Sequence, residues 1–191
     1  MSRPNKCIKD TDGKEYWISR STVVIPIVFK YDIQNNDIYT LVERRGPAVS
    51  HQGEWCCPCG YIDWDESLEE ACVREVREET GLELDEERIK LFEVSTDKHT
   101  KTQTIDLFYE CWTAYESDFH IDRIETKDEI LDVKWLKVAH MDNDVKGGTL
   151  TLFKKSIYEG YGKWAFKTHH THIIDMLKSR FHECNIETID E

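Results

Sequence analysis

The sequence has no run of apolar residues long enough to cross a membrane. The longest, VVIPIVF at 23–29, has seven residues and is interrupted by Pro26, whereas a membrane-spanning helix needs about 20. The first ten residues, MSRPNKCIKD, lack the apolar stretch of a secretory signal. We therefore expect a cytoplasmic protein that does not associate with membranes.

Basic charge is also scarce. The chain has 25 Lys and Arg against 38 Asp and Glu, a formal net charge of −13. Such a charge repels nucleic-acid backbones and anionic lipids, and no basic stripe offsets it. We expect no nucleic-acid partner. A small anionic substrate would be repelled too, unless metal ions neutralise its site.

The cysteines do not indicate a disulfide framework or a zinc site. Seven cysteines, an odd number without an export signal, indicate free thiols in a reducing compartment. Cys56, Cys57 and Cys59 lie close together, but no second Cys or His pair has the spacing of a zinc finger. We interpret them as small apolar side chains of the interior.

The length of 191 residues and an apolar content of 39% predict one globular domain at 16–183, between a lead-in at 1–15 and a tail at 184–191. Strands are predicted at 16–29, 38–45, 89–97, 102–115 and 130–136, with a short extended segment at 54–60. Helices are predicted at 67–80 and at about 164–181. Hairpins combined with helices favour a mixed sheet with helices on its faces.

The helix at 67–80 has the clearest boundaries. Ser67 and Glu70 have the spacing of a capping box, and Gly81 stands where a left-handed residue would end the helix. The later helix carries His169, His170 and His172, which have no i,i+4 pair. We interpret these histidines as surface or packing residues.

Three carboxylates of the first helix share one face. Glu75, Glu78 and Glu79 have i, i+3, i+4 spacing, and such like charges destabilise a helix by roughly a few tenths of a kcal/mol per pair. On charge alone, a solvated helix face is the commoner explanation. A hard cation such as Mg²⁺ would reverse the repulsion, because it binds carboxylate oxygens together with substrate phosphates.

The pattern around these glutamates favours the cation. Residues 60–82 match G-x5-E-x7-R-E-U-x-E-E-x-G-U, where U is a bulky aliphatic residue; this is the Nudix box. The chain resembles the MutT-like Nudix hydrolases over roughly residues 16–180. The resemblance implies a Nudix fold, an α/β/α sandwich around a mixed β-sheet. It also implies Mg²⁺- or Mn²⁺-dependent hydrolysis of a pyrophosphate bond in a nucleoside diphosphate linked to another group.

The resemblance also implies roles for individual residues. Glu75, Glu78 and Glu79 would bind metal, Arg74 would hold one of these glutamates, and Glu66 would bind metal through water or fix the loop. The general base is a glutamate of the box or a later acidic residue. The later candidates are Glu125, Asp128 and Glu129, and we favour Glu129 because it directly precedes a strand. A solvated loop carboxylate explains Glu129 equally well.

Two further features surround the box. Arg44 and Arg45 end a strand that approaches the site, and only one can contact phosphate because neighbouring strand residues point to opposite faces. Pro58-Cys59-Gly60 stands where many members have Pro-Gly-Gly, and Asp65 stands where glycine is common. These departures put the local backbone geometry in question more than catalysis.

Substrate choice in the family that this chain resembles is set by residues outside the box. A nucleotide sugar or another nucleoside-diphosphate derivative ranks first, followed by nucleoside triphosphates and a coenzyme A-like dinucleotide. The alternative class is a catalytically silent Nudix-fold sensor or regulator, but such proteins usually lose box glutamates, and all are present here. The features of the related isopentenyl diphosphate isomerases are not evident. A homodimer is left open.

Overall fold

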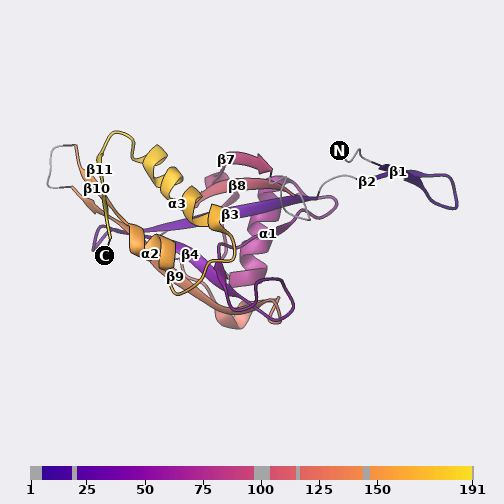
Figure 1. The fold of residues 1–191 in the computed structure, drawn as a ribbon, viewed down its shortest axis with the longest axis horizontal. Helices are drawn as coiled ribbons and strands as arrows, with labels where there is room; N and C mark the ends of the chain where they lie inside the picture. The colour runs from indigo at the N-terminus through magenta and orange to yellow at the C-terminus, as the bar shows by residue number, and fades with distance from the viewer. Residues whose placement is uncertain (1–5, 19–20, 97–103, 115–116, 144–146, 191) are drawn as a thin grey trace.

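The computed structural model describes residues 6–18, 21–96, 104–114, 117–143 and 147–190 (Figure 1). The strands are β1 (Lys6–Lys9), β2 (Glu15–Ile18), β3 (Thr22–Asp32), β4 (Asp37–Arg45), β5 (Trp55–Cys56), β6 (Gly60–Tyr61), β7 (Ile89–Thr96), β8 (Ile105–Trp112), β9 (Ile130–Asp142), β10 (Thr149–Phe153) and β11 (Asn185–Ile189). The helices are α1 (Leu68–Thr80), α2 (Lys154–Glu159) and α3 (Lys167–Arg180), with 3-10 turns at Glu86–Arg88 and Ile121–Arg123.

One mixed sheet organises the molecule, in the order β11-β10-β9-β4-β3-β8-β7. The β3–β4 and β7–β8 pairs are antiparallel, as the two predicted hairpins require, whereas β3 and β8 run parallel. The turn expected between β7 and β8 at 98–101 lies outside the described residues. The short strands β5 and β6 pair with β4 and β3, so the segment that precedes α1 is attached to the centre of the sheet.

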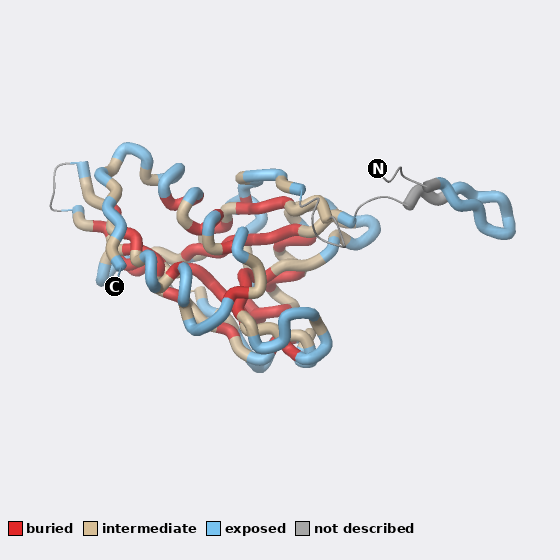
Figure 2. The backbone as a smooth tube through the Cα atoms, viewed as in Figure 1, coloured by how far each residue is buried: buried red, intermediate tan, exposed pale blue. Residues whose placement is uncertain are grey.

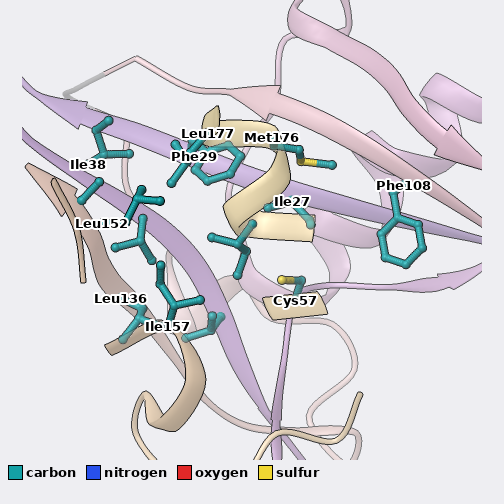
Figure 3. Close-up of a cluster of buried hydrophobic side chains, with 14 of the residues drawn as sticks. Ile27, Phe29, Ile38, Cys57, Phe108, Leu136, Leu152, Ile157, Met176 and Leu177 are labelled. Carbon is teal, nitrogen blue, oxygen red and sulfur yellow. The ribbon is translucent and has the colours of Figure 1, made fainter. Parts of the chain in front are cut away.

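Helices cover both faces of this sheet, because its central strands are apolar on both sides. One core lies under α2 and α3, and it includes Phe29, Ile157 and Met176 (Figure 3). The other lies under α1, where Leu41 and Val76 are buried. Figure 2 shows buried backbone along the strands between exposed helix surfaces and loops. The predicted α/β/α sandwich around a mixed sheet is therefore confirmed.

The first helix begins and ends where the sequence predicts. Ser67 Oγ accepts a hydrogen bond from Glu70 N at 3.1 Å, and the Glu70 carboxylate accepts one from Ser67 N at 2.6 Å, which completes the capping box. Gly81 ends the helix at φ 72°, and a side chain there would overlap the carbonyl oxygen of His120. Only glycine satisfies both demands without strain.

The ends of the chain differ from our expectations. The lead-in and the first predicted strand contain a separate hairpin, β1–β2, which Figure 1 shows apart from the rest of the fold. The segment expected to be a tail forms β11, which pairs in parallel with β10 at the edge of the main sheet. The sequence prediction missed β1 and β11, which have only four and five residues, because segments this short carry little periodicity. Among the described residues, no helix is both long and apolar enough to cross a membrane.

Candidate active site

A pocket of about 340 Å³ lies where α1 meets the β5–β6 bend, the end of β4 and the start of β9. Six residues proposed from the sequence line it: Arg45, Arg74, Glu75, Glu78, Glu79 and Glu129. Glu75 and Glu79 are only 8% and 5% exposed. The helix spacing therefore directs these carboxylates into the protein, and the solvated-face explanation does not describe them.

Arg74 connects the loop before α1 to the carboxylates on α1. Its Nε and Nη2 donate to the two oxygens of Glu66 at 2.9 and 2.8 Å, a bidentate pair. Its Nη1 donates to Glu75 at 2.9 Å and to Glu78 at 3.3 Å. The hydrogen bonds from Arg74 lower the pKa of Glu66. Arg74 therefore orients carboxylates and holds the loop at Tyr61, whose carbonyl it also contacts at 2.9 Å.

Glu66 is not among the residues that line the pocket. Besides the pair with Arg74, one of its oxygens accepts a hydrogen bond from Asp63 N at 2.6 Å. This geometry matches the loop-fixing role among the two that the sequence left open. Gly60 closes the same loop against α1, because a side chain on Gly60 would overlap the Glu75 carboxylate.

The innermost carboxylate of the site was not identified from the sequence. Glu43 lies on β4, is 0% exposed, and its carboxylate interacts with that of Glu79. Burial raises the pKa of Glu43 to about 8, and the neighbouring Cys59 thiol adds to the shift. Burial also raises the pKa of Glu79 well above its usual range, with Glu43 and Glu75 as further causes. Each of these two adjacent buried carboxylates disfavours ionisation of the other, which is why both pKa values move upward.

A sequence signal for Glu43 does exist. Glu43 directly follows the apolar pair Leu41-Val42 of β4, and it lies two positions before Arg45, hence on the same face of the strand. A lone buried carboxylate in a central strand requires partners. The partners, Glu79 and Cys56, come from α1 and β5, so only the assembled fold identifies them.

The two arginines at the end of β4 are separated as the alternation predicts. Arg45 lines the pocket, with Nε donating to the carbonyl of Ser50 at 2.7 Å. Arg44 is aligned with Trp55 on the neighbouring strand, and its Nε is buried with no hydrogen-bond partner among the described residues. Of these two arginines, Arg45 is the one placed to meet an anion in this pocket.

The segment before β9 brings one of the three later acidic candidates to the pocket. Gly46 N donates to the carbonyl of Glu129, and Ala48 N donates to that of Asp128 at 3.0 Å, so this segment is fixed beside the end of β4. Glu129 lines the pocket. Glu125 instead lies 3.6 Å from Arg77 in an exposed ion pair.

The pocket supplies carboxylate oxygens, the type of ligand that a hard divalent cation binds. Across the described ranges, no three His, Cys, Asp or Glu side chains stand in an arrangement that could hold a metal ion. Arg74 holds Glu75 and Glu78, while Cys59 N donates to Glu79 at 2.9 Å. Burial nevertheless raises the pKa of Glu75 despite its contact with Arg74. The carboxylates Glu43, Glu75, Glu78, Glu79 and Glu129 outnumber the two arginines of the site, Arg45 and Arg74. Oxygen ligands are those that Mg²⁺ and Mn²⁺ prefer.

The cysteines and histidines outside this set are largely structural. Cys56 and Cys57 are fully buried, as expected of small interior side chains. His169 accepts a hydrogen bond from Cys57 N at 3.1 Å, and His172 stacks on Phe108 with ring centroids 3.6 Å apart. Both histidines are buried, so the packing interpretation holds for them.

Comparison with known proteins agrees with the fold and identifies the family. Residues 21–156 match the NUDIX domain family, and the chain therefore belongs to the Nudix family. It is 28% identical over 130 residues to Nudix hydrolase 7 of Arabidopsis thaliana, covering 64% of this chain but only 45% of that protein. It is 29% identical over 136 residues to nucleoside triphosphatase NudI of Escherichia coli, covering 65% and 89% of the two chains.

A solved structure shows the same fold. The NUDIX domain of Shewanella oneidensis NrtR, in complex with ADP ribose, superposes with a TM-score of 0.61 at 19% identity. The match covers 90% of this chain and 92% of that one. The Nudix fold expected from residues 60–82 is thus confirmed.

Proposed function

We propose that this protein is a hydrolase that cleaves the pyrophosphate bond of a nucleoside diphosphate linked to another group, using Mg²⁺ or Mn²⁺. The observation that carries the proposal is the set of three glutamates, Glu75, Glu78 and Glu79, gathered with Arg45 around one pocket. Charge of this density is costly without a cation. Family membership adds support, because NudI is named as a nucleoside triphosphatase and the NrtR domain was solved in complex with ADP ribose.

The reaction adds water across a P–O–P linkage. A new bond forms between the water oxygen and phosphorus, the bridging P–O bond breaks, and the second phosphate leaves. When bound, the divalent cation neutralises charge on the phosphates and increases the acidity of the water. Glu75, Glu78 and Glu79 would hold it, and Glu66 would act on this set through Arg74.

The remaining steps belong to side chains of the pocket. Arg45 binds a phosphate oxygen, since its guanidinium lines the pocket and its charge matches the anion. Glu129, which lines the same pocket, accepts the proton of the attacking water. Among the described contacts of Arg74, none involves Glu129, which leaves Glu129 available as a base. Glu78 and Glu79 are the alternative bases within the box.

The proposal also covers the substrate class, the partners, the cellular location and the oligomeric state. A nucleotide sugar or similar nucleoside-diphosphate derivative is the first substrate class to test, followed by nucleoside triphosphates and coenzyme A-like dinucleotides. With a net charge of −13 we infer no nucleic-acid partner. The odd number of cysteines favours free thiols in a reducing compartment, and we infer a cytoplasmic location. Light scattering at several concentrations decides between a monomer and the homodimer that the sequence leaves open.

The test is a substrate panel assayed for nucleotide and phosphate release with and without Mg²⁺. We expect metal-dependent turnover of at least one member, and a loss of about 10²-fold or more in kcat/KM for Glu78→Gln combined with Glu79→Gln. Glu69→Gln, on the same helix, is the matched control because Glu69 does not line the pocket. Unchanged activity in the double variant contradicts the proposal. Nucleotide binding without turnover by the wild type would instead support a sensor.

A further inference from the structure

Two thiols lie side by side in the wall of the pocket. Cys56 and Cys59 are three residues apart in the β5–β6 bend, and Arg45 Nη1 lies 3.6 Å from Cys56 Sγ and 4.0 Å from Cys59 Sγ. One guanidinium nitrogen therefore contacts both sulfur atoms. The intervening Cys57 belongs to the core under α3 and, unlike Cys59, does not line the pocket (Figure 3).

The two thiols differ in access. Cys56 is fully buried, and burial raises the pKa of its thiol well above the usual range, with a hydrogen bond to the Cys59 thiol as the next cause. Cys59 is only partly buried and lines the pocket. A small oxidant that enters the pocket therefore meets Cys59 first, and Cys56 is the nearest thiol behind it.

We propose that Cys56 and Cys59 are an oxidation site, at which hydrogen peroxide converts the two thiols into an intramolecular disulfide. The Cys59 sulfur attacks one peroxide oxygen, the O–O bond breaks, and a sulfenic acid and one water form. The Cys56 sulfur then attacks the Cys59 sulfur, which releases a second water. In total two thiols and one peroxide give one disulfide and two waters.

The disulfide changes the site through Cys59. Its backbone N–H holds Glu79 at 2.9 Å, and the adjacent Gly60 is packed against the Glu75 carboxylate. Drawing the Cys59 side chain toward Cys56 shifts this backbone and removes the contacts of both sulfurs with Arg45. We expect oxidation to slow hydrolysis reversibly, an expectation that rests on the proposed hydrolase function. Transient disulfides of this kind are the usual ones in a reducing compartment.

The oxidation itself is tested by thiol mapping, which needs no activity. The full chain carrying Cys7→Ser, to remove an exposed thiol, is treated with peroxide, alkylated in denaturant and digested with trypsin. Residues 46–74 contain no Lys or Arg before Arg74, so all the relevant thiols stay on one peptide. We expect this peptide to lose two alkylation sites and fragment ions to place the link between Cys56 and Cys59.

The variants separate the pair from its neighbours. Cys56→Ser and Cys59→Ser should each abolish the link, whereas Cys57→Ala should retain it; circular dichroism checks that each is folded. Both thiols remaining free, a link that uses Cys57 or Cys72, or a sulfinic acid on Cys59 without a link would overturn the proposal.

Activity is then measured on the same samples. Oxidation should lower the hydrolysis rate about tenfold or more, with recovery in dithiothreitol, because small displacements of catalytic groups have effects of this size. A mapped disulfide with an unchanged rate would refute the effect on the pocket. If the reduced protein hydrolyses no substrate, the proposed function fails, while the mapping still decides the thiol pair.

Discussion

Acid should destabilise this protein through His169, a histidine of α3 that is only 2% exposed. Its Nδ1 accepts a hydrogen bond from Cys57 N at 3.1 Å, so a proton on that nitrogen would break the bond and bury a charge. Burial lowers the pKa of His169 to about 3, and the neighbouring His172, Arg45 and His170 contribute in the same direction. The imidazole is therefore held neutral in the folded state.

The size of the effect follows from the two protonation equilibria. An unfolded histidine titrates near pH 6.5, so between about pH 6.5 and pH 3 the unfolded chain binds a proton that the folded chain refuses. The stability due to neutral His169 is complete above this window and is lost as the pH falls through it. Between about pH 7 and pH 5 the loss is about 2 kcal/mol.

Other groups titrate with the opposite sign, so the wild type alone is not a clean measurement. Glu43, with its pKa raised to about 8, contributes stability at low pH that is lost as the pH rises from about 4.5 through 8. The free energy of unfolding of the wild type is therefore compared with that of His169→Asn at each pH. The asparagine oxygen can still accept the hydrogen bond from Cys57 N, but the side chain does not titrate.

Urea unfolding followed by tryptophan fluorescence gives the free energy of unfolding at each pH. The variant should be less stable near pH 7, because it loses the ring contacts with Phe108 and Phe166. The gap between wild type and variant should then narrow by about 2 kcal/mol near pH 5. His182→Asn is the exposed control and should leave the pH profile of stability unchanged. A gap that stays constant with pH would refute the reasoning.

Three other predictions concern the site and α1. Gly60→Ala places a methyl group on the Glu75 carboxylate and should lower kcat/KM about 100-fold in a pyrophosphate hydrolysis assay; unchanged kinetics would contradict the packing seen here. Arg74→Lys should weaken Mn²⁺ binding about tenfold or more by calorimetry, because one ammonium cannot replace the guanidinium that joins several carboxylates. Equal affinity would show that Arg74 does not orient the ligands. Ser67→Ala should lower the free energy of unfolding by about 1 kcal/mol in urea titrations while kcat stays unchanged. No loss of stability would mean that the capping box contributes little.

The sequence was sufficient for the loop and helix that carry the box. The capping box at Ser67, the glycine stop at Gly81 and the i, i+3, i+4 spacing of the glutamates are properties of one contiguous segment, and the structure agrees with each. Local hydrogen-bond geometry and helix periodicity set them, so no distant partner is needed. The same holds for the β3–β4 hairpin, whose apolar strands flank a polar turn.

Strands at the edge of the sheet were harder to predict from the sequence. The partly exposed residues of β11 have little apolar periodicity, and the strand exists because it pairs with β10, a strand that is itself short. Strand propensity depends on such neighbours more than on the strand itself. The limits of the domain at 16–183 remain a prediction.

The chain alone determined that three glutamates and an arginine on one helix would face a common site, because their spacing along α1 fixes their direction. Only the tertiary structure decided that Glu43 lies beneath Glu79, that Arg45 and not Arg44 enters the pocket, and that His169 supports Cys57. These relations join residues far apart in sequence. They depend on burial and on the pairing of polar groups across elements, which no local pattern encodes.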